Sequence, residues 1–216
     1  MKFSTIIPAH NEESHIRRTL ETIKKYGSKN NEIIVVLDSC TDNTEEIARE
    51  FTNKLIETNS NAPSDTRNLG AKHAEGEMLV FIDADSIISS NYYSEIQLAF
   101  ERGSDYGFAK YVSESKNTIG RYIAFLTTHT IRLDKNIPGN FFIKKDIFNK
   151  QNGFLPGLVQ GEDSELGSRL KKSKCNFKFL NNAYIIPSER KYHENGWVKE
   201  HLFSLKKAAL WTFHRN

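Results

Sequence analysis

The sequence of 216 residues is poor in cysteine: Cys40 and Cys175 are its two cysteines, and they form no CxxC pair. Neither a disulfide framework nor a cysteine-rich zinc module is therefore expected, and a reducing compartment is the simplest setting. No apolar run approaches the roughly 18–20 residues that a membrane-spanning helix requires. The amino terminus turns polar too early to form the apolar core of a signal peptide. These absences predict a soluble, cytoplasmic protein.

The charge of the chain is nearly balanced, with 30 Lys and Arg against 27 Asp and Glu. A net charge of +3 is too small to indicate a nucleic-acid-binding protein, so no nucleic-acid partner is expected. Hydrophobic residues make up 38% and charged residues 26%, which is typical of a globular chain and excludes a disordered or fibrous one. The length suits about one domain.

Strand-like and helix-like stretches alternate in the first half of the sequence. The expected strands are residues 3–7, 33–37, 55–56 and 78–82, and the expected helices are residues 13–26, 42–51 and 64–74. Pro8 is expected to end the first strand, and Ser64 or Asp65 to cap the third helix. Two of the strands are wholly apolar, as in strands that are buried on both faces. This order predicts an α/β fold with a mostly parallel sheet and helices on both faces.

The second half of the sequence is less regular. The expected helices are residues 91–102, 118–133, 145–150 and 162–172, and the expected strands are residues 106–112, 140–143 and 177–186. Residues 197–213 also have helical spacing of their apolar side chains.

Polar residues follow directly where three of the expected strands end. The segment 8–12 follows the first strand, Asp38 follows the second, and Asp83 and Asp85 follow the fourth. In an open parallel sheet, ligands bind beyond the carboxyl ends of the strands. We therefore expect these residues to meet at one edge of the sheet.

Asp83 and Asp85 are two residues apart, so in an extended chain they face the same side. Two adjacent carboxylates repel each other unless a proton or a cation lies between them. Mg²⁺ and Mn²⁺ commonly bind a few carboxylates together with substrate phosphates. The pair thus predicts a divalent cation that bridges the protein to a diphosphate, and a solvated turn after a strand is the alternative.

Four motifs of the first half resemble those of the family 2 glycosyltransferases of GT-A fold. They are STIIPAHNEE (4–13), EIIVVLDSCTDNT (32–44), RNLG (67–70) and FIDADS (81–86). A second cluster resembles the acceptor half of that family: PGNFFIKKDIF (138–148), GFLP (153–156) and GEDSEL (161–166). The resemblance implies one Rossmann-like GT-A domain over residues 1–190. Its nucleotide-binding half is 1–86, its acceptor half is 87–190, and an amphipathic helix follows at 191–216.

The resemblance also implies roles for individual residues of the nucleotide pocket. Pro8, Ala9 and Glu12 would line it, and Asp38 would accept hydrogen bonds from the base or the ribose. Arg67 would lie near the base and the diphosphate, where a guanidinium at a helix start can bind a phosphate with both of its terminal nitrogens. An arginine on a solvated helix face is the alternative.

For the metal and the catalytic base, the resemblance implies Asp83 and Asp85 as the D-x-D pair, with Asp85 ahead of Asp83 as the direct metal ligand. His193 is a candidate third ligand, and a surface histidine is its alternative. Asp163 would be the base that takes the proton of the acceptor hydroxyl, and Glu162 would raise the pKa of Asp163 by repulsion. Alternatively, these acids belong to a helix start and are favoured there by the helix dipole.

The function implied is a metal-dependent inverting glycosyltransferase of hexosyltransferase type, using Mn²⁺ or Mg²⁺. It would move a sugar from a nucleotide-diphosphate donor, most simply a UDP-sugar, to a hydroxyl of a saccharide or lipid-linked acceptor. The alternative is a non-catalytic nucleotide-sugar-binding module that acts as a regulatory or assembly subunit.

Residues 197–213 carry an apolar stripe beside Lys199, Lys206 and Lys207. One interpretation is an interfacial helix that binds anionic lipid at the inner face of the membrane. The other, which we favour, is a helix that packs on its own domain or in a homodimer interface, because amphipathic helices usually face a core.

Overall fold

The computed structural model describes residues 1–115, 118–196 and 199. The strands of the described residues are β1 (Phe3–Ala9), β2 (Asn31–Asp38), β3 (Lys54–Thr58), β4 (Met78–Phe81), β5 (Ile87–Ile88), β6 (Tyr106–Tyr111), β7 (Phe141–Lys144) and β8 (Phe177–Ile186). The helices are α1 (Ile16–Tyr26), α2 (Thr44–Arg49), α3 (Pro63–His73), α4 (Tyr92–Glu101), α5 (Thr118–Asp134), α6 (Lys145–Lys150), α7 (Glu162–Lys172) and α8 (Arg190–Asn195).

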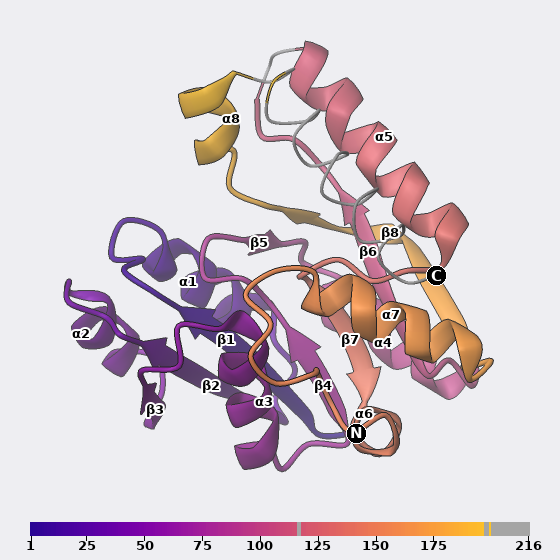
Figure 1. The fold of residues 1–216 in the computed structure, drawn as a ribbon, viewed down its shortest axis with the longest axis horizontal. Coiled ribbons are helices and arrows are strands. Elements are labelled where there is room, and N and C mark those ends of the chain that lie inside the picture. The colour runs from indigo at the N-terminus through magenta and orange to yellow at the C-terminus, as the bar shows by residue number, and fades with distance from the viewer. Residues whose placement is uncertain (116–117, 197–198, 200–216) are drawn as a thin grey trace.

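All of these strands join one sheet, in the order β3-β2-β1-β4-β7-β6-β8-β5 (Figure 1). The first four strands along the chain pair with one another in parallel, as predicted. The second half adds antiparallel pairs, because β7 runs against both β4 and β6, and β5 runs against β8. The α/β fold is thus confirmed, with a sheet that is mixed in its second half.

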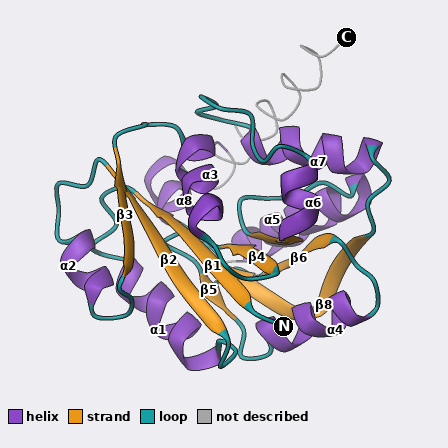
Figure 2. Cartoon of the chain, turned by 90° about the horizontal axis from the view of Figure 1, so that it is seen from below, coloured by secondary structure: helices purple, strands orange, loops and turns teal. Residues whose placement is uncertain are grey.

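Helices cover both faces of the sheet (Figure 2). Side chains of α1, α2 and α4 share one core with alternate strand residues such as Ile7, and side chains of α3, α6 and α7 share the other with residues such as Ile6. Successive strand residues point to opposite faces, so a strand between two helix layers must be apolar throughout. Burial of each such isoleucine stabilises the fold by about 1.5–3 kcal/mol.

Pro8 does not end the first strand, contrary to the prediction: β1 continues to Ala9, and Pro8 lies opposite Val36 of β2. The carbonyl of Ile6 accepts a hydrogen bond from the backbone N–H of Ile82 at 3.1 Å, so the backbone polar groups of Ile6 point toward β4. The backbone of Pro8, two residues further on, points the same way. No strand lies beside it there, because β4 has ended at Phe81. The missing N–H of Pro8 therefore costs no hydrogen bond of the sheet.

The predicted capping of α3 by Ser64 or Asp65 is also wrong, because the helix begins at Pro63 and its N-cap, Ala62, makes no side-chain cap. These two side chains instead hold a loop that is distant in sequence. The Ser64 hydroxyl accepts a hydrogen bond from the N–H of Leu158 at 2.9 Å, and the Asp65 carboxylate accepts one from the N–H of Gly157 at 3.0 Å. The start of α3 thereby fixes the loop that leads into α7.

The predicted helix at 197–213 lies outside the described residues, apart from Lys199. Among the helices that the structure does describe, none combines the length and the apolar character of a membrane-spanning segment.

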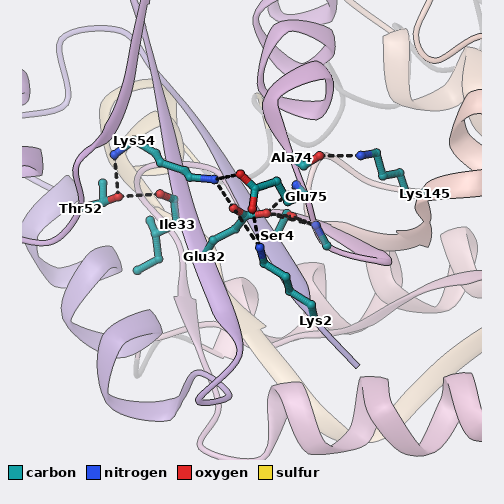
Figure 3. Close-up of polar contacts among 10 residues, drawn as sticks. Lys2, Ser4, Glu32, Ile33, Thr52, Lys54, Ala74, Glu75 and Lys145 are labelled. Atoms are coloured by element: carbon teal, nitrogen blue, oxygen red, sulfur yellow. Dashed lines mark hydrogen bonds and ion pairs between the residues drawn. The ribbon is translucent and has the colours of Figure 1, made fainter.

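A network of charged side chains lies at the amino-terminal ends of the parallel strands (Figure 3). Glu32 of β2 accepts hydrogen bonds from Ser4, from Lys54 and from the backbone N–H of Glu75. Lys2 and Lys54 both pair with Glu75, at 2.6 and 2.8 Å, and lower its pKa to about 2. Burial alone would raise the pKa of Glu32, but the bonds from Lys54 and Ser4 outweigh burial and lower it. This edge therefore holds β1, β2, β3 and the turn before β4 together.

We predict that Glu32→Gln lowers the free energy of unfolding by about 1–3 kcal/mol at pH 7, because buried donors lose a charged acceptor. The native pKa of Glu32 lies below its ordinary value of 4.5. The contribution is therefore complete above that value, and it is lost as the pH falls further. Urea unfolding at pH 7 and pH 3 measures it, with the exposed Glu57→Gln as control. Equal losses for the two variants would contradict the role of Glu32.

Candidate active site

A cavity of about 480 Å³ lies at the carboxyl ends of β1 and β2, beside the loop that follows β4. Predicted nucleotide and metal residues line it together: Pro8, Ala9, Glu12, Asp38, Arg67, Asp83 and Asp85. The structure thus brings distant segments to one edge of the sheet, as the topology requires. Arg190 of α8 also lines the cavity, whereas Asp163 lies outside its lining.

Asp38 ends β2 and is buried, with 7% of its surface exposed. Its carboxylate accepts hydrogen bonds from the Thr66 hydroxyl at 2.9 Å, from the Ser60 hydroxyl at 3.2 Å and from the Asn61 N–H at 3.2 Å. Buried carboxylates need such donors to offset lost hydration. These bonds fix the orientation of Asp38 at the wall of the cavity.

Arg67 of α3 is buried between two carboxylates. Its Nη2 atom lies 2.8 Å from Oδ1 of Asp83, and its Nη1 atom donates to Glu162 of α7. Burial alone would lower the pKa of Arg67, but Asp83 and Glu162 outweigh burial and raise it. Both terminal nitrogens thus contact protein acids rather than facing an open phosphate site. The prediction that Arg67 lies near a diphosphate stays a prediction.

Asn140 also belongs to the site, although it was not predicted from the sequence. Its side-chain amide donates to Oδ2 of Asp83 at 3.0 Å and accepts a hydrogen bond from the Asp83 N–H at 2.8 Å. The preceding Gly139 is needed for this approach, since a Cβ at that position would lie 2.9 Å from Oδ2 of Asp83. The Pro-Gly-Asn run at the start of an expected strand was the sequence feature that could have indicated this residue. Arg67 and Asn140 together hold the Asp83 carboxylate in place.

Asp85, in contrast, receives no hydrogen bond on its carboxylate from any residue that the structure describes. Its pKa is raised to about 6, first by burial and then by the negative charges of Asp83 and Glu12. Arg190, which bonds to Glu12 at 3.2 Å, offsets part of this effect. An acid in such surroundings is stabilised by a proton or by a cation.

The oxygen donors of Asp85 and Asp83 suit Mg²⁺ or Mn²⁺, and the raised pKa of Asp85 indicates that a positive charge there would stabilise the site. Among the side chains that the structure describes, no group of three or more His, Cys, Asp or Glu is arranged to hold a metal ion. The side chain of His193 lies outside the described part of the structure, so its role as a third ligand stays a prediction.

Asp163 lies in the first turn of α7, which begins after Gly161 in a left-handed conformation with φ of 75°. Its pKa is raised to about 6, first by burial and then by Glu162, as the sequence argument expected of that neighbour. Arg67 and Asp83 also act on this pKa, in opposite directions. Asp163 is therefore electrostatically coupled to the cavity through the Arg67 ion pairs.

Comparison with known proteins identifies the family. A family model described as glycosyl transferase family 2 matches residues 4–158, which is well over half of the chain. The chain belongs to glycosyl transferase family 2. This match spans the segments that supply Pro8, Asp38, Arg67 and the Asp83–Asp85 pair, and it ends before Asp163.

Two curated relatives in this family show the extent of the sequence similarity. Over 97 residues the chain is 40% identical to the poly(ribitol-phosphate) beta-N-acetylglucosaminyltransferase TarS of Staphylococcus aureus, covering 41% of this chain and 17% of TarS. Over 222 residues it is 28% identical to the probable glycosyltransferase YdaM of Bacillus subtilis, covering 91% of this chain and 53% of YdaM. The chain thus spans between about one sixth and about one half of these two relatives.

Solved structures of other glycosyltransferases share the fold. The structure of S. aureus TarS 1–349 in complex with UDP has a TM-score of 0.72 at 22% identity, covering 90% of this chain and 63% of that one. The mannosyltransferase PcManGT from Pyrobaculum calidifontis, in complex with GDP-Man and Mn²⁺, has a TM-score of 0.72 at 18% identity, covering 95% of this chain and 64% of that one. The predicted GT-A fold is confirmed.

We predict that Arg67→Met lowers the free energy of unfolding by about 3–5 kcal/mol, because it leaves Glu162 buried without a partner. Adding Glu162→Gln should recover part of this loss, since the uncompensated charge is removed. Urea unfolding at pH 7 measures both variants. The control Arg49→Met breaks an exposed pair with Glu45 and should cost less than about 1 kcal/mol. A loss for Arg67→Met no larger than that of the control would show that the buried pairing is unimportant.

Proposed function

We propose that this chain carries a metal-dependent inverting glycosyltransferase that moves a sugar from a nucleotide-diphosphate donor, a UDP-sugar, to a hydroxyl acceptor. The observation that carries the proposal is the convergence of Asp38, Asp83 and Asp85 on one cavity at the carboxyl ends of the strands. Solved relatives support it, because TarS has been captured with UDP and with UDP-GlcNAc, and PcManGT with GDP-Man and Mn²⁺.

The cavity suits a nucleotide in size and in lining. Its volume of about 480 Å³ falls within the range of small-molecule sites. Asp38 would accept hydrogen bonds from the base or the ribose, and Pro8, Ala9 and Glu12 would form the adjoining wall. Arg190 bonds to Glu12 and lines the same cavity, so it would supply a positive charge near a bound diphosphate.

Asp85 and Asp83 would hold Mn²⁺ or Mg²⁺, with His193 proposed as a third ligand. A bound cation would act as a Lewis acid that stabilises the negative charge of the leaving diphosphate. Arg67 and Asn140 already engage Asp83. Of these two aspartates, Asp85 is the one whose oxygens accept no hydrogen bond from the described residues, which supports its proposed role as the direct ligand.

Asp163 would act as the catalytic base. A pKa of about 6 leaves it ionised at neutral pH, yet more basic than an ordinary aspartate. In a single displacement, the acceptor oxygen forms a bond to the anomeric carbon while the bond to the diphosphate breaks. The hydroxyl proton passes to Asp163.

Calorimetric titration of UDP with and without Mn²⁺ tests the donor site. We predict that Asp85→Asn weakens Mn²⁺-dependent UDP binding by about tenfold or more, because a charged ligand oxygen is lost. The matched control is Asp146→Asn on α6, which should bind as wild type does. If Asp85→Asn bound UDP and Mn²⁺ as tightly as wild type, the metal assignment would be refuted. Parallel titrations of GDP, CDP and dTDP test the base preference.

Release of UDP from UDP-sugars, followed against pH, tests the base. We predict that Asp163→Asn retains UDP binding but loses about 10²–10⁴-fold in rate, because no side chain takes the proton. The wild-type kcat/KM should fall tenfold per pH unit below the pKa of about 6, where Asp163 is protonated. Transfer by Asp163→Asn at the wild-type rate would remove this assignment. UDP binding by wild type without any turnover would favour the binding-module alternative.

A further inference from the structure

A second cavity, of about 280 Å³, lies between β6 and α5. Four basic side chains line it: Lys110, Arg121, His129 and Arg132. The described residues that form its lining include no aspartate or glutamate. We call this hollow the basic cavity.

The cations of the basic cavity lack acidic partners. Lys110, Arg121 and Arg132 form no ion pair with any residue that the structure describes, although other arginines of the chain pair closely, as Arg17 does with Glu50. The guanidinium of Arg132 lies 4.8 Å from the ring centre of Phe179, which orients it without neutralising it. Three positive charges thus line a hollow whose described lining supplies no counter-charge, which favours the binding of an anion.

The spacing along α5 indicates more than one anionic group. Arg121, Phe125, Thr128 and Arg132 follow one another at intervals of four, three and four residues, so they lie on one stripe of the helix. At about 1.5 Å per residue, Arg121 and Arg132 are about 16 Å apart along the axis. A chain that carries several phosphates can engage both ends of this stripe.

Tyr111 joins the basic cavity to the candidate active site. It lines the basic cavity, and its backbone N–H donates to the Thr128 hydroxyl of α5 at 2.9 Å. Burial, then the charge of Asp83, raises the pKa of Tyr111, and Asn140, which bonds to Asp83, offsets part of this rise. Tyr111 thus links the lining of the basic cavity to the residues around Asp83.

We propose that the basic cavity binds the phosphate groups of the acceptor, and that the acceptor is a hydroxyl-bearing chain with two or more phosphates. This inference rests on the proposed function, because it assigns the acceptor class of the same reaction. Arginine recognises phosphate oxygens with paired N–H donors, and two arginines on one stripe would fix the register of such a chain. These arginines would bind and position the acceptor, and the transfer step would be the one described under the proposed function.

The test uses the full chain with inorganic polyphosphate of about ten units as the probe, at low salt and without divalent cations, because paired arginine contacts to phosphate are then unscreened. We expect Arg121→Gln/Arg132→Gln to weaken polyphosphate binding by about tenfold or more, and Arg121→Lys/Arg132→Lys to retain part of it. The control Lys72→Gln/Arg102→Gln removes the same charge from exposed positions elsewhere and should bind as wild type does. Equal losses for the glutamine variant and the control would overturn the proposal.

Two further arms separate the possible explanations. UDP binding with Mn²⁺ should be unchanged in Arg121→Gln/Arg132→Gln, which reports an intact fold and donor cavity. If wild type bound polyphosphate through these arginines but bound no nucleotide, the proposed function would fail and the anion site would stand. Flotation with phosphatidylglycerol vesicles tests a lipid surface: vesicle binding that depends on the arginines, with polyphosphate binding that does not, would overturn the proposal.

Discussion

The buried guanidinium of Arg67 is the interaction on which the candidate site depends. It joins α3, the loop after β4 and the start of α7 by bonding to Asp83 and to Glu162. A buried charge without a partner is strongly unfavourable, so the three segments must be placed together for any of these groups to be buried. The positions of the neighbouring Asp85 and Asp163 follow from this one side chain.

The same interaction divides the acids of the site into two kinds. In each pair of nearby acids, Asp83 with Asp85 and Glu162 with Asp163, one member bonds to Arg67 and the other does not. The pKa of each acid that is not bonded to Arg67, Asp85 and Asp163, is raised to about 6. Titratable groups in contrasting environments are characteristic of sites that combine cation binding with proton transfer. The arrangement is therefore consistent with the proposed roles of Asp85 as a metal ligand and Asp163 as a base.

Much of this could be predicted from the sequence, because periodic segments and strand ends carry local signals. The helices at 145–150 and 162–172 and the strand at 177–186 have the bounds that the pattern predicts. The failures depend on tertiary contacts: Pro8 stays in its strand because β4 is shorter, and Asn140 acts on Asp83 across 57 residues. No local pattern could show that Arg67 also bonds to Glu162, 95 residues away.

A crystal structure with UDP and Mn²⁺, in which anomalous scattering locates the manganese, tests most directly whether the acids around Arg67 form one donor and metal site. We expect an anomalous peak within about 2.5 Å of the Asp85 carboxylate, with the diphosphate beside it and Asp163 facing the adjoining space. A nucleotide bound elsewhere, or manganese away from Asp85 in an occupied cavity, would contradict it.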